Sequence, residues 1–411
     1  MSYLTIERLG TAAACLSILA GSATAQDGGE ETKRSWTIRA EAVHTATGDV
    51  IEDAFVQIQD GRIAAMGPGG PSGGDILEVA AVTPGLIDLS IRIDSGRDSV
   101  EEVHESTPWM PVAMTLDLFD PEWKRELESG VTTGVVAPNA RNVIGGLSAA
   151  LKTGGEPTLE GRLLEKSVGV SAIIGTSPSS GNRPAFIRPS GIYNRRPTTR
   201  MGVEWEARKA FYDALVARED ETQTFPGAEE LHAVLDGRMP LIAQAATTQD
   251  IRTTLMLKAE FELPNVILDS AAEAWKEPEM LQRSGASVVL PPFSWDGRTD
   301  IDGGFMAWDT AARLAELGVP FAFSGHGSSN ADNALAMQPT YAIRGGLDPA
   351  AALAAVTITP ARMVGIDDRV GSIEVGKHAD LCLWNGPPFH PTSTIVGVLL
   401  EGELIVDPRQ R

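Results

Sequence analysis

Apolar and polar positions alternate in short runs at both ends of the chain. One run spans 54–59, Asp60-Gly61 follows it, and a second run spans 62–66. Asp-Gly between two such runs is a strong signal for a β-hairpin. Runs of the same kind return near the C-terminus at 380–384, 395–400 and 404–406. We therefore expect one composite β-module, a small sandwich built from 36–82 plus 366–407.

Between these ends, strand-like apolar runs alternate with helix-like segments. Strands are expected at 86–93, 131–136, 241–245, 266–269, 287–290 and 320–324. Helices are expected at 121–129, 250–261 with Asp250 as the capping residue, 278–284, 307–317, 329–345 and 349–356. This alternation predicts an α/β domain with a parallel sheet and helical crossovers. The length of the region, 83–365, suits a barrel better than an open sheet, although periodicity alone does not require the sheet to close.

Residues 177–200 break the alternation. The stretch is rich in Ser, Pro and Gly and carries five arginines: Arg183, Arg188, Arg195, Arg196 and Arg200. A long irregular stretch is either a plain surface insertion or a functional segment such as a lid. Because arginine is enriched at protein interfaces, we expect this segment to contact a partner or to cover the barrel mouth, unless it is a plain insertion.

The N-terminus has the features of an export signal. Arg8 precedes an apolar run from Leu9 to Ala20, and Ala23-Thr24-Ala25 has the small-x-small form that signal peptidase recognises. The run is too short to span a bilayer, so no membrane anchor is expected after cleavage behind Ala25. The alternative is a disordered or partly buried N-terminus. Cleavage would leave Cys382 as the single cysteine, without an intrachain disulfide, in a periplasmic or secreted protein.

The formal charge of −21 argues against nucleic acid as a partner. No basic run is dense enough to neutralise a series of phosphates. Net acidity of this kind reports on solubility and association and carries no information about the fold.

Several motifs, in order along the whole chain, resemble one family. They are Asp60–Ile63, Val82–Asp88, Gly130–Thr133, Asn142–Gly146, Thr359–Ala361 and Asp368–Leu381. Together they are similar to the imidazolonepropionase-like branch of the amidohydrolase superfamily. The resemblance implies a (β/α)₈ TIM barrel beside a composite β-sandwich. It also implies an ancestral reaction in which zinc or another divalent metal turns water into a hydroxide that attacks a C–N bond other than a peptide bond.

The ligands that such a metal would need are missing from the motifs. After Leu86-Ile87-Asp88 the family pattern continues x-His-x-His, and two histidines two apart on a strand point the same way and share one metal. Here those positions hold Ser90 and Arg92. Arginine stays protonated and offers no lone pair to a metal.

The other strand ends depart from the pattern in the same way. Gln244 and Ser270 stand where the resemblance places histidines, and His326 stands where it places an aspartate, or Gly325 if the alignment slips by one. Lys152 resembles a lysine that some relatives carboxylate to bridge two metals. Without the other ligands that carbamate would have no metal to stabilise it, and the alternative is an ordinary lysine.

The remaining residues do not rebuild a metal site in sequence terms. Of the six histidines, only His104 and His326 are expected near the barrel mouth. Two histidines with Asp269 or Gln244 match poorly the three or four ligands that zinc takes, and Arg92 would add a positive charge. We therefore expect no bound metal or other cofactor.

Three uses of the altered strand ends remain open. The polar residues could simply fill a former metal pocket with hydrogen bonds. Ser90, Ser270 and His326 could form a metal-free hydrolytic site, since a histidine can activate a serine. Alternatively, Arg92, Arg141, Gln244 and His326 could bind a small anionic ligand such as a carboxylate.

The family resemblance and the residues at the expected metal site therefore predict different functions. By resemblance the chain is a hydrolase of non-peptide C–N bonds; by its residues we expect a catalytically impaired or inactive pseudoenzyme that acts as a binding or partner subunit. Its expected partner is a second copy of itself or an intact amidohydrolase paralogue. An active hydrolase with an atypical, metal-free site is the alternative.

Overall fold

The computed structural model describes residues 35–70, 76–93, 99–182, 195–293, 304–326 and 334–410. The expected signal peptide (1–25), Arg183 and Arg188 lie outside the described residues, as does the start of the helix expected at 329–345.

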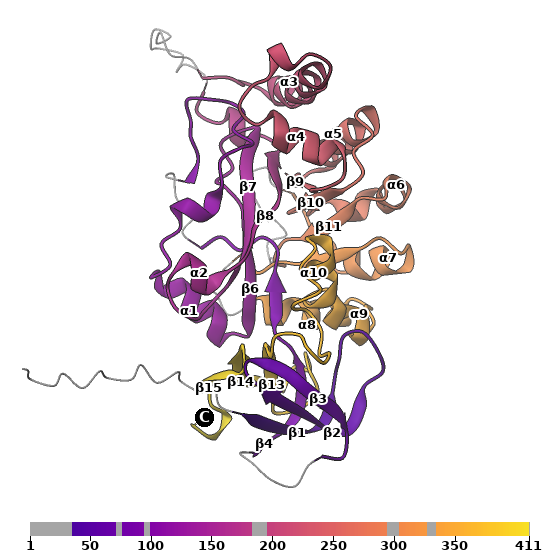
Figure 1. The fold of residues 1–411 in the computed structure, drawn as a ribbon. Coiled ribbons are helices and arrows are strands. Elements are labelled where there is room, and N and C mark those ends of the chain that lie inside the picture. Colours follow the sequence, from indigo (N-terminus) through magenta and orange to yellow (C-terminus); the bar gives the residue numbers. More distant parts are fainter. Residues whose placement is uncertain are drawn as a thin grey trace, which may run out of the picture. The chain divides into compact units, whose positions relative to one another are not determined.

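Both ends of the chain build one seven-stranded sheet (Figure 1). Its strands are β1 Trp36–Val43, β2 Ile51–Gln59, β3 Arg62–Pro68, β4 Ile76–Pro84, β13 Leu381–Trp384, β14 Ile395–Leu400 and β15 Glu403–Val406, in the order β15-β14-β13-β4-β1-β2-β3. The two ends meet where β13 pairs antiparallel with β4, with Leu381 opposite Pro84. Asp60 and Gly61 both have positive φ (52° and 79°), as a two-residue hairpin turn requires. The prediction that both ends of the chain build one composite β-module is confirmed.

The middle of the chain forms an eight-stranded barrel sheet. Its strands are β5 Leu86–Asp88, β6 Val131–Val136, β7 Ile144–Lys152, β8 Leu163–Ile173, β9 Leu241–Gln244, β10 Val266–Asp269, β11 Ser287–Leu290 and β12 Phe321–Phe323, paired in chain order. The gap between β12 and β5 is bridged by backbone: Phe323 N–H donates to Ala355 O, and Ile87 N–H donates to Val356 O. The predicted α/β barrel fold is thereby confirmed.

Two strands differ from the sequence prediction. The first barrel strand was expected to reach Ile93 but ends at Asp88, and the chain turns at Leu89–Ser90. β7 runs antiparallel to both β6 and β8, so the sheet is not parallel throughout. The connection from β6 to β7 covers residues 137–143, which is shorter than the dozen or so residues that a parallel crossover needs.

Helices cover the outside of the barrel sheet (Figure 1). They are α1 Pro121–Glu128, α2 Leu159–Arg162, α3 Arg200–Glu219, α4 Ala228–Leu235, α5 Thr248–Glu260, α6 Pro278–Ser284, α7 Thr310–Glu316, α8 Gln338–Arg344, α9 Pro349–Ala354 and α10 Ile358–Met363. The prediction of Asp250 as a cap was wrong. Helix α5 begins two residues earlier, and the Asp250 carboxylate lies in its first turn, where it accepts a hydrogen bond from Thr247 Oγ1.

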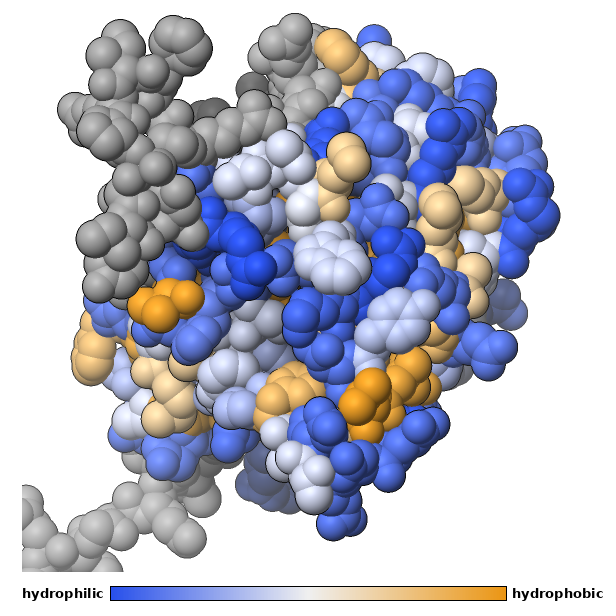
Figure 2. All heavy atoms as spheres, turned by 90° about the horizontal axis from the view of Figure 1, so that it is seen from above, coloured by the Kyte–Doolittle hydropathy of each residue, from blue (hydrophilic) through white to orange (hydrophobic). Residues whose placement is uncertain are grey.

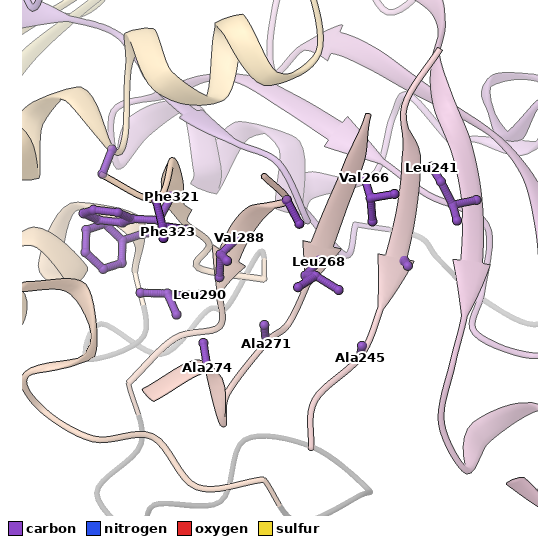
Figure 3. Packing of buried hydrophobic residues seen from close by; sticks show 14 of the residues in the cluster. Leu241, Ala245, Val266, Leu268, Ala271, Ala274, Val288, Leu290, Phe321 and Phe323 are labelled. Atoms are coloured by element: carbon purple, nitrogen blue, oxygen red, sulfur yellow. The ribbon is translucent and has the colours of Figure 1, made fainter. Parts of the chain in front are cut away.

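The strands bury both faces, and alternate residues take opposite sides. Ile242, Ile267, Val289 and Ala322 share one buried cluster inside the barrel. Their neighbours in sequence join a second cluster with the helices; Figure 3 shows Leu241, Val266, Leu268, Val288, Leu290, Phe321 and Phe323 among them. Because strand side chains alternate with period two, this parity fixes which residue at each strand end points inward.

A buried ion pair joins the barrel to the composite sheet. The Lys152 ammonium, at the end of β7, donates to the Asp380 carboxylate just before β13. The two side chains are 3% and 4% exposed. Asp380 also accepts a hydrogen bond of 2.8 Å from Glu401 N–H, so its carboxylate is held on both oxygens.

No helix within the described ranges has the length and apolarity to cross a membrane.

We predict that Lys152→Met strongly destabilises the fold. The substitution leaves the Asp380 carboxylate buried without its cation, and loss of one partner of a buried pair costs about 3–5 kcal/mol. Chemical denaturation followed by circular dichroism measures the difference. The control is Lys124→Met, whose ion pair with Glu128 leaves the lysine 76% exposed and should change stability little. Equal effects of the two substitutions would contradict a structural role for the Lys152–Asp380 pair.

Candidate functional site

The ends of β9 and β10 place two polar side chains on the inner side of the barrel. Gln244 and Asp269 each come two residues after an inward residue, Ile242 and Ile267, and the two polar residues are register partners. Period-two alternation therefore carries both side chains to the carboxyl end of the barrel, where sites in barrel enzymes lie.

The loop after β5 brings Ser90 and Arg92 to the same end. Ser90 Oγ donates to Asp269 Oδ2 at 3.0 Å. Arg92 Nη2 donates to Ser270 Oγ at 3.3 Å, and Ser270 Oγ lies 3.4 Å from Asp269 Oδ1. Ser270 has a positive φ of 55°, which turns the chain directly after β10. Ser90, Arg92, Asp269 and Ser270 thus form one connected hydrogen-bond network.

His326 extends this network from the loop after β12. Its Nε2 lies 3.3 Å from Ser270 Oγ, and its backbone N–H donates to Ser324 Oγ at 2.9 Å. Ser270 has one hydroxyl proton to donate. With Nε2 protonated, His326 donates to Ser270 and Ser270 donates to Asp269, so that each group has a partner.

Asp88 holds the two loops together from below the network. Its Oδ1 accepts a hydrogen bond from Ser90 N–H at 2.9 Å, and its Oδ2 accepts one from Gly325 N–H at 2.8 Å. The side chain is fully buried, and burial raises its pKa. Both carboxylate oxygens are therefore already engaged in fixing the ends of β5 and β12.

Burial shifts the charge states of the network. Burial raises the pKa of Asp269 to about 6, although Arg92 and the hydrogen bond from Ser90 act in the opposite direction. Burial, and then the positive charge of Arg92, lower the pKa of His326 well below its usual value. At neutral pH the network therefore contains a guanidinium, a carboxylate and an uncharged imidazole.

A cavity of about 270 Å³ adjoins the network. Polar residues on its wall include Ser90, Arg92, Asn139, Ser171, Gln244 and Asp269. Ser270 and His326 are not part of the wall, and Ser270 is only 1% exposed. The accessible polar groups are thus those of Arg92, Asp269 and their neighbours, with the Ser270–His326 pair behind them.

The structure does not bring Lys152, Arg141 or His104 into the network. Lys152 lies at the opposite end of the barrel, because β7 runs antiparallel to its neighbours. It is therefore not at the mouth, where a lysine that bridges two metals would have to lie. Arg141 Nη1 donates to Ser180 O at 2.7 Å and thereby holds the loop that contains Ser177, another residue on the cavity wall. His104 is exposed and is not on the wall.

In segment 177–200, the arginines that the structure describes form hydrogen bonds or ion pairs with other residues of the same chain. Arg195 donates to Asn142 Oδ1, Arg196 lies 3.5 Å from Glu105, and Arg200 lies 3.2 Å from Asp250. These contacts tie the C-terminal end of the segment to the barrel. The described arginines therefore have structural partners within the chain. These contacts do not support the expected role of the segment as a lid or a partner contact.

The residues at the mouth do not fit the divalent metal that the family resemblance implies. In the parts of the chain that the structure describes, no three His, Cys, Asp or Glu side chains are grouped to hold a metal ion. Both carboxylate oxygens of Asp88 accept hydrogen bonds from backbone N–H groups, and the Asp269 carboxylate accepts hydrogen bonds from the hydroxyls of Ser90 and Ser270. Arg92 adds a fixed positive charge beside Ser270, and a cation placed there would be repelled.

Sequence reasoning missed Asp88, Asn139, Ser171 and Ser177 as residues of the site. Ser171 lies in β8, a strand that the sequence prediction left out, so its inward parity was not available. Asn139 follows the end of β6, and its place after a predicted strand was a signal that could have found it.

A larger cavity of about 1000 Å³ lies elsewhere in the fold. Its wall comes mainly from the loop after β1, helices α8 and α9, and residues 387–391, and it is mostly apolar. None of the network residues contributes to it, so size alone does not identify the site.

The comparisons with known proteins agree with this architecture. The model of the Amidohydrolase family matches residues 307–406. The chain is 26% identical over 394 residues to "Amidohydrolase tasK" of Hapsidospora irregularis, which covers 86% of this chain and 37% of that protein. The chain therefore spans well under half the length of this relative.

Shorter stretches are more similar to enzymes of one branch. A segment of 78 residues is 45% identical to the imidazolonepropionase of Aromatoleum aromaticum and covers 18% of this chain and 19% of that enzyme. The crystal structure of an amidohydrolase from Thermotoga maritima matches with a TM-score of 0.77 at 24% identity, over 90% of this chain and 99% of that one. That likeness shows the fold alone.

We predict that Asp269 makes the stability of the fold pH-dependent in a defined window. Its pKa is about 6 in the folded chain against a usual value of 3.8, so the folded state binds more protons between these values. Its contribution to stability is therefore greatest below about pH 4 and is lost as the pH rises through about 6. Asp269→Asn removes this component. Melting temperatures of both proteins across this window measure the difference.

The control for this titration is Asp49→Asn, which changes an exposed carboxylate by the same substitution. It should leave the pH profile of the melting temperature parallel to that of the unmodified chain. An Asp269→Asn profile that is also parallel would show that Asp269 does not titrate in this window.

Proposed function

We propose that this chain, which belongs to the amidohydrolase superfamily and to its imidazolonepropionase-like branch, binds a small carboxylate at the barrel mouth and does not hydrolyse it through a bound metal. The protein is then a binding subunit that has kept the fold of a C–N hydrolase. The observation that carries the proposal is Arg92, whose guanidinium stands at the cavity wall where the family would place a metal ligand.

The chemistry of the cavity wall supports a carboxylate as the ligand. Arginine carries five N–H donors in a planar fork that matches a carboxylate. Among the described residues, Arg92 uses one N–H donor in the hydrogen bond to Ser270. Because its side chain is exposed, the other N–H donors are available to a ligand. Asn139, Ser171 and Gln244 add neutral hydrogen-bonding groups around it.

The size of the cavity limits the ligand to a small molecule. Sites for drug-sized ligands occupy roughly 300–1,000 Å³. A volume of about 270 Å³ lies just below that range. A short carboxylic acid with one polar substituent matches both the size and the mixed polarity of the wall.

A metal-free hydrolase is the second candidate, and one distance favours it. Ser270 Oγ lies 3.3 Å from His326 Nε2, close to the range in which a histidine activates a serine. Access argues against it, because Ser270 is buried and neither residue reaches the cavity wall. A hydrolytic role for the pair would require the loops after β10 and β12 to open.

Export and association complete the proposal. The N-terminal residues support cleavage after Ala25 and a periplasmic or secreted location. A partner subunit role would follow naturally for a chain that binds a ligand without transforming it; the partner is either a second copy or an intact paralogue.

The proposal is tested with N-acetylglycine and its uncharged amide as matched probes. Isothermal titration calorimetry should detect binding of N-acetylglycine and not of N-acetylglycinamide. Arg92→Gln should weaken the binding about tenfold or more, because a charge-assisted hydrogen bond contributes roughly 1.5–3 kcal/mol. Arg283→Gln, at an exposed position away from the cavity, is the control and should bind as the unmodified chain does.

Elemental analysis of protein purified without chelator separates the alternatives. We expect well under one equivalent of zinc or another divalent metal. One or more tightly held equivalents would overturn the proposal. Hydrolysis of an amide probe that survives metal removal and is abolished by Ser270→Ala would establish the second candidate instead.

A further inference from the structure

Helix α3 buries a face of mainly small apolar residues and exposes four large side chains on another face, of which Tyr212 also donates its hydroxyl to Glu260 Oε1 at 3.0 Å. Its buried positions are Val203, Ala207, Ala210, Phe211, Ala214 and Ala217. On the other side, Met201, Trp205, Tyr212 and Val216 are 81%, 59%, 49% and 48% exposed. We refer to these four residues as the α3 stripe. Large apolar side chains in such a row are unusual on a surface that only water contacts.

The four residues form one narrow line along the helix. Successive residues of an α-helix are about 100° apart, so spacings of four, seven and four residues keep the stripe within an arc of about 60°. In Figure 2, which looks down on the end of the molecule where α3 lies in Figure 1, apolar and weakly polar residues interrupt a mainly hydrophilic surface.

The spacings between successive stripe residues, four, seven and four, are the same when counted from either end of the helix. If a second α3 lies antiparallel on the first, Met201 falls opposite Val216 of the second copy, and Trp205 falls opposite its Tyr212. A twofold interface requires this property, since each surface must complement itself. A parallel arrangement would not pair these residues in the same way, because like residues would then meet.

If two copies associate, charge favours this helix over the rest of the surface as the place of contact. The chain as a whole carries a formal charge of −21, so two copies repel each other over most of their surfaces. Helix α3 carries four basic and four acidic residues and is locally neutral. At its centre, Arg208 pairs with Glu204 and Glu260, and Lys209 pairs with Asp213. The charges beside the stripe are therefore balanced within one chain.

We propose that the α3 stripe is the interface of a homodimer, in which two α3 helices pack antiparallel about a twofold axis. Tryptophan, tyrosine and methionine are the residue types that protein interfaces enrich, and large aromatic residues commonly dominate the binding energy. The interface lies outside the network at the barrel mouth and does not depend on what that mouth binds.

The first test is the mass of the full chain in solution, measured by sedimentation equilibrium over a range of concentrations. The unmodified chain should be a dimer. Trp205→Glu places two charges in the twofold interface and should raise the dimer dissociation constant at least about tenfold. Phe119→Glu, at an apolar residue 77% exposed and outside α3, is the matched control and should remain dimeric. A monomer at every concentration, or equal behaviour of the two variants, would overturn the proposal.

The second test fixes the direction of the helices by disulfide formation. In a Cys15→Ser background, where Cys382 stays buried, Met201→Cys/Val216→Cys should form a disulfide-linked dimer on mild oxidation. The two positions are about 22 Å apart within one helix, so an intrachain bond is excluded. Met201→Cys alone should not cross-link. Efficient cross-linking of this single variant, or none by the double variant, would exclude the antiparallel arrangement.

Discussion

The buried carboxylate of Asp88 is the constraint on which the barrel mouth depends. β5 and β12 are the edge strands of the barrel sheet and do not pair with each other directly. Asp88 accepts N–H groups from Ser90 and Gly325, and so joins the chain just after β5 to the chain just after β12. Ser90, Arg92 and His326 all lie on the loops that this carboxylate fixes. A carboxyl group in a fully buried place is tolerated because both of its oxygens are hydrogen-bonded.

In the network next to Asp88, an arginine and a carboxylate balance each other's charge, where a metal centre would balance carboxylates with a metal ion. A metal centre balances carboxylates with a cation that can leave, and it needs ligands with lone pairs. Here Arg92 supplies a positive charge that is covalently part of the chain, and Asp269 supplies the negative one. The imidazole of His326 is kept neutral by burial and by the charge of Arg92. A guanidinium binds anions well but does not acidify water as a metal does, and the proposed binding role rests on this difference.

Local patterns in the sequence predicted what depends on near neighbours. The composite sheet followed from alternating runs and Asp60-Gly61, and the family resemblance placed Gln244 at the end of its strand. β7 was not predicted, and its antiparallel direction depends on the length of connections and on distant pairing. This direction places Lys152 at the end of the barrel opposite the mouth. Ser90 and Arg92 were placed on a strand that ends at Asp88. The positive φ angles of Ser270 and His326 could not be read from residue type, since neither is glycine and histidine is only modestly enriched in that region.

One stretch of chain connects the barrel mouth with the α3 stripe. Ser177 is on the cavity wall, and Arg141 holds the backbone around it. Asn182, in the same loop, donates to Pro197 O at 2.7 Å, and Thr199 caps the first turn of α3 through Gly202 N–H. Arg200, the first residue of α3, is tied to Asp250 in α5. A displacement of α3 on pairing would therefore act on the cavity wall through Pro197 and Asn182, as well as through the barrel core against which α3 packs.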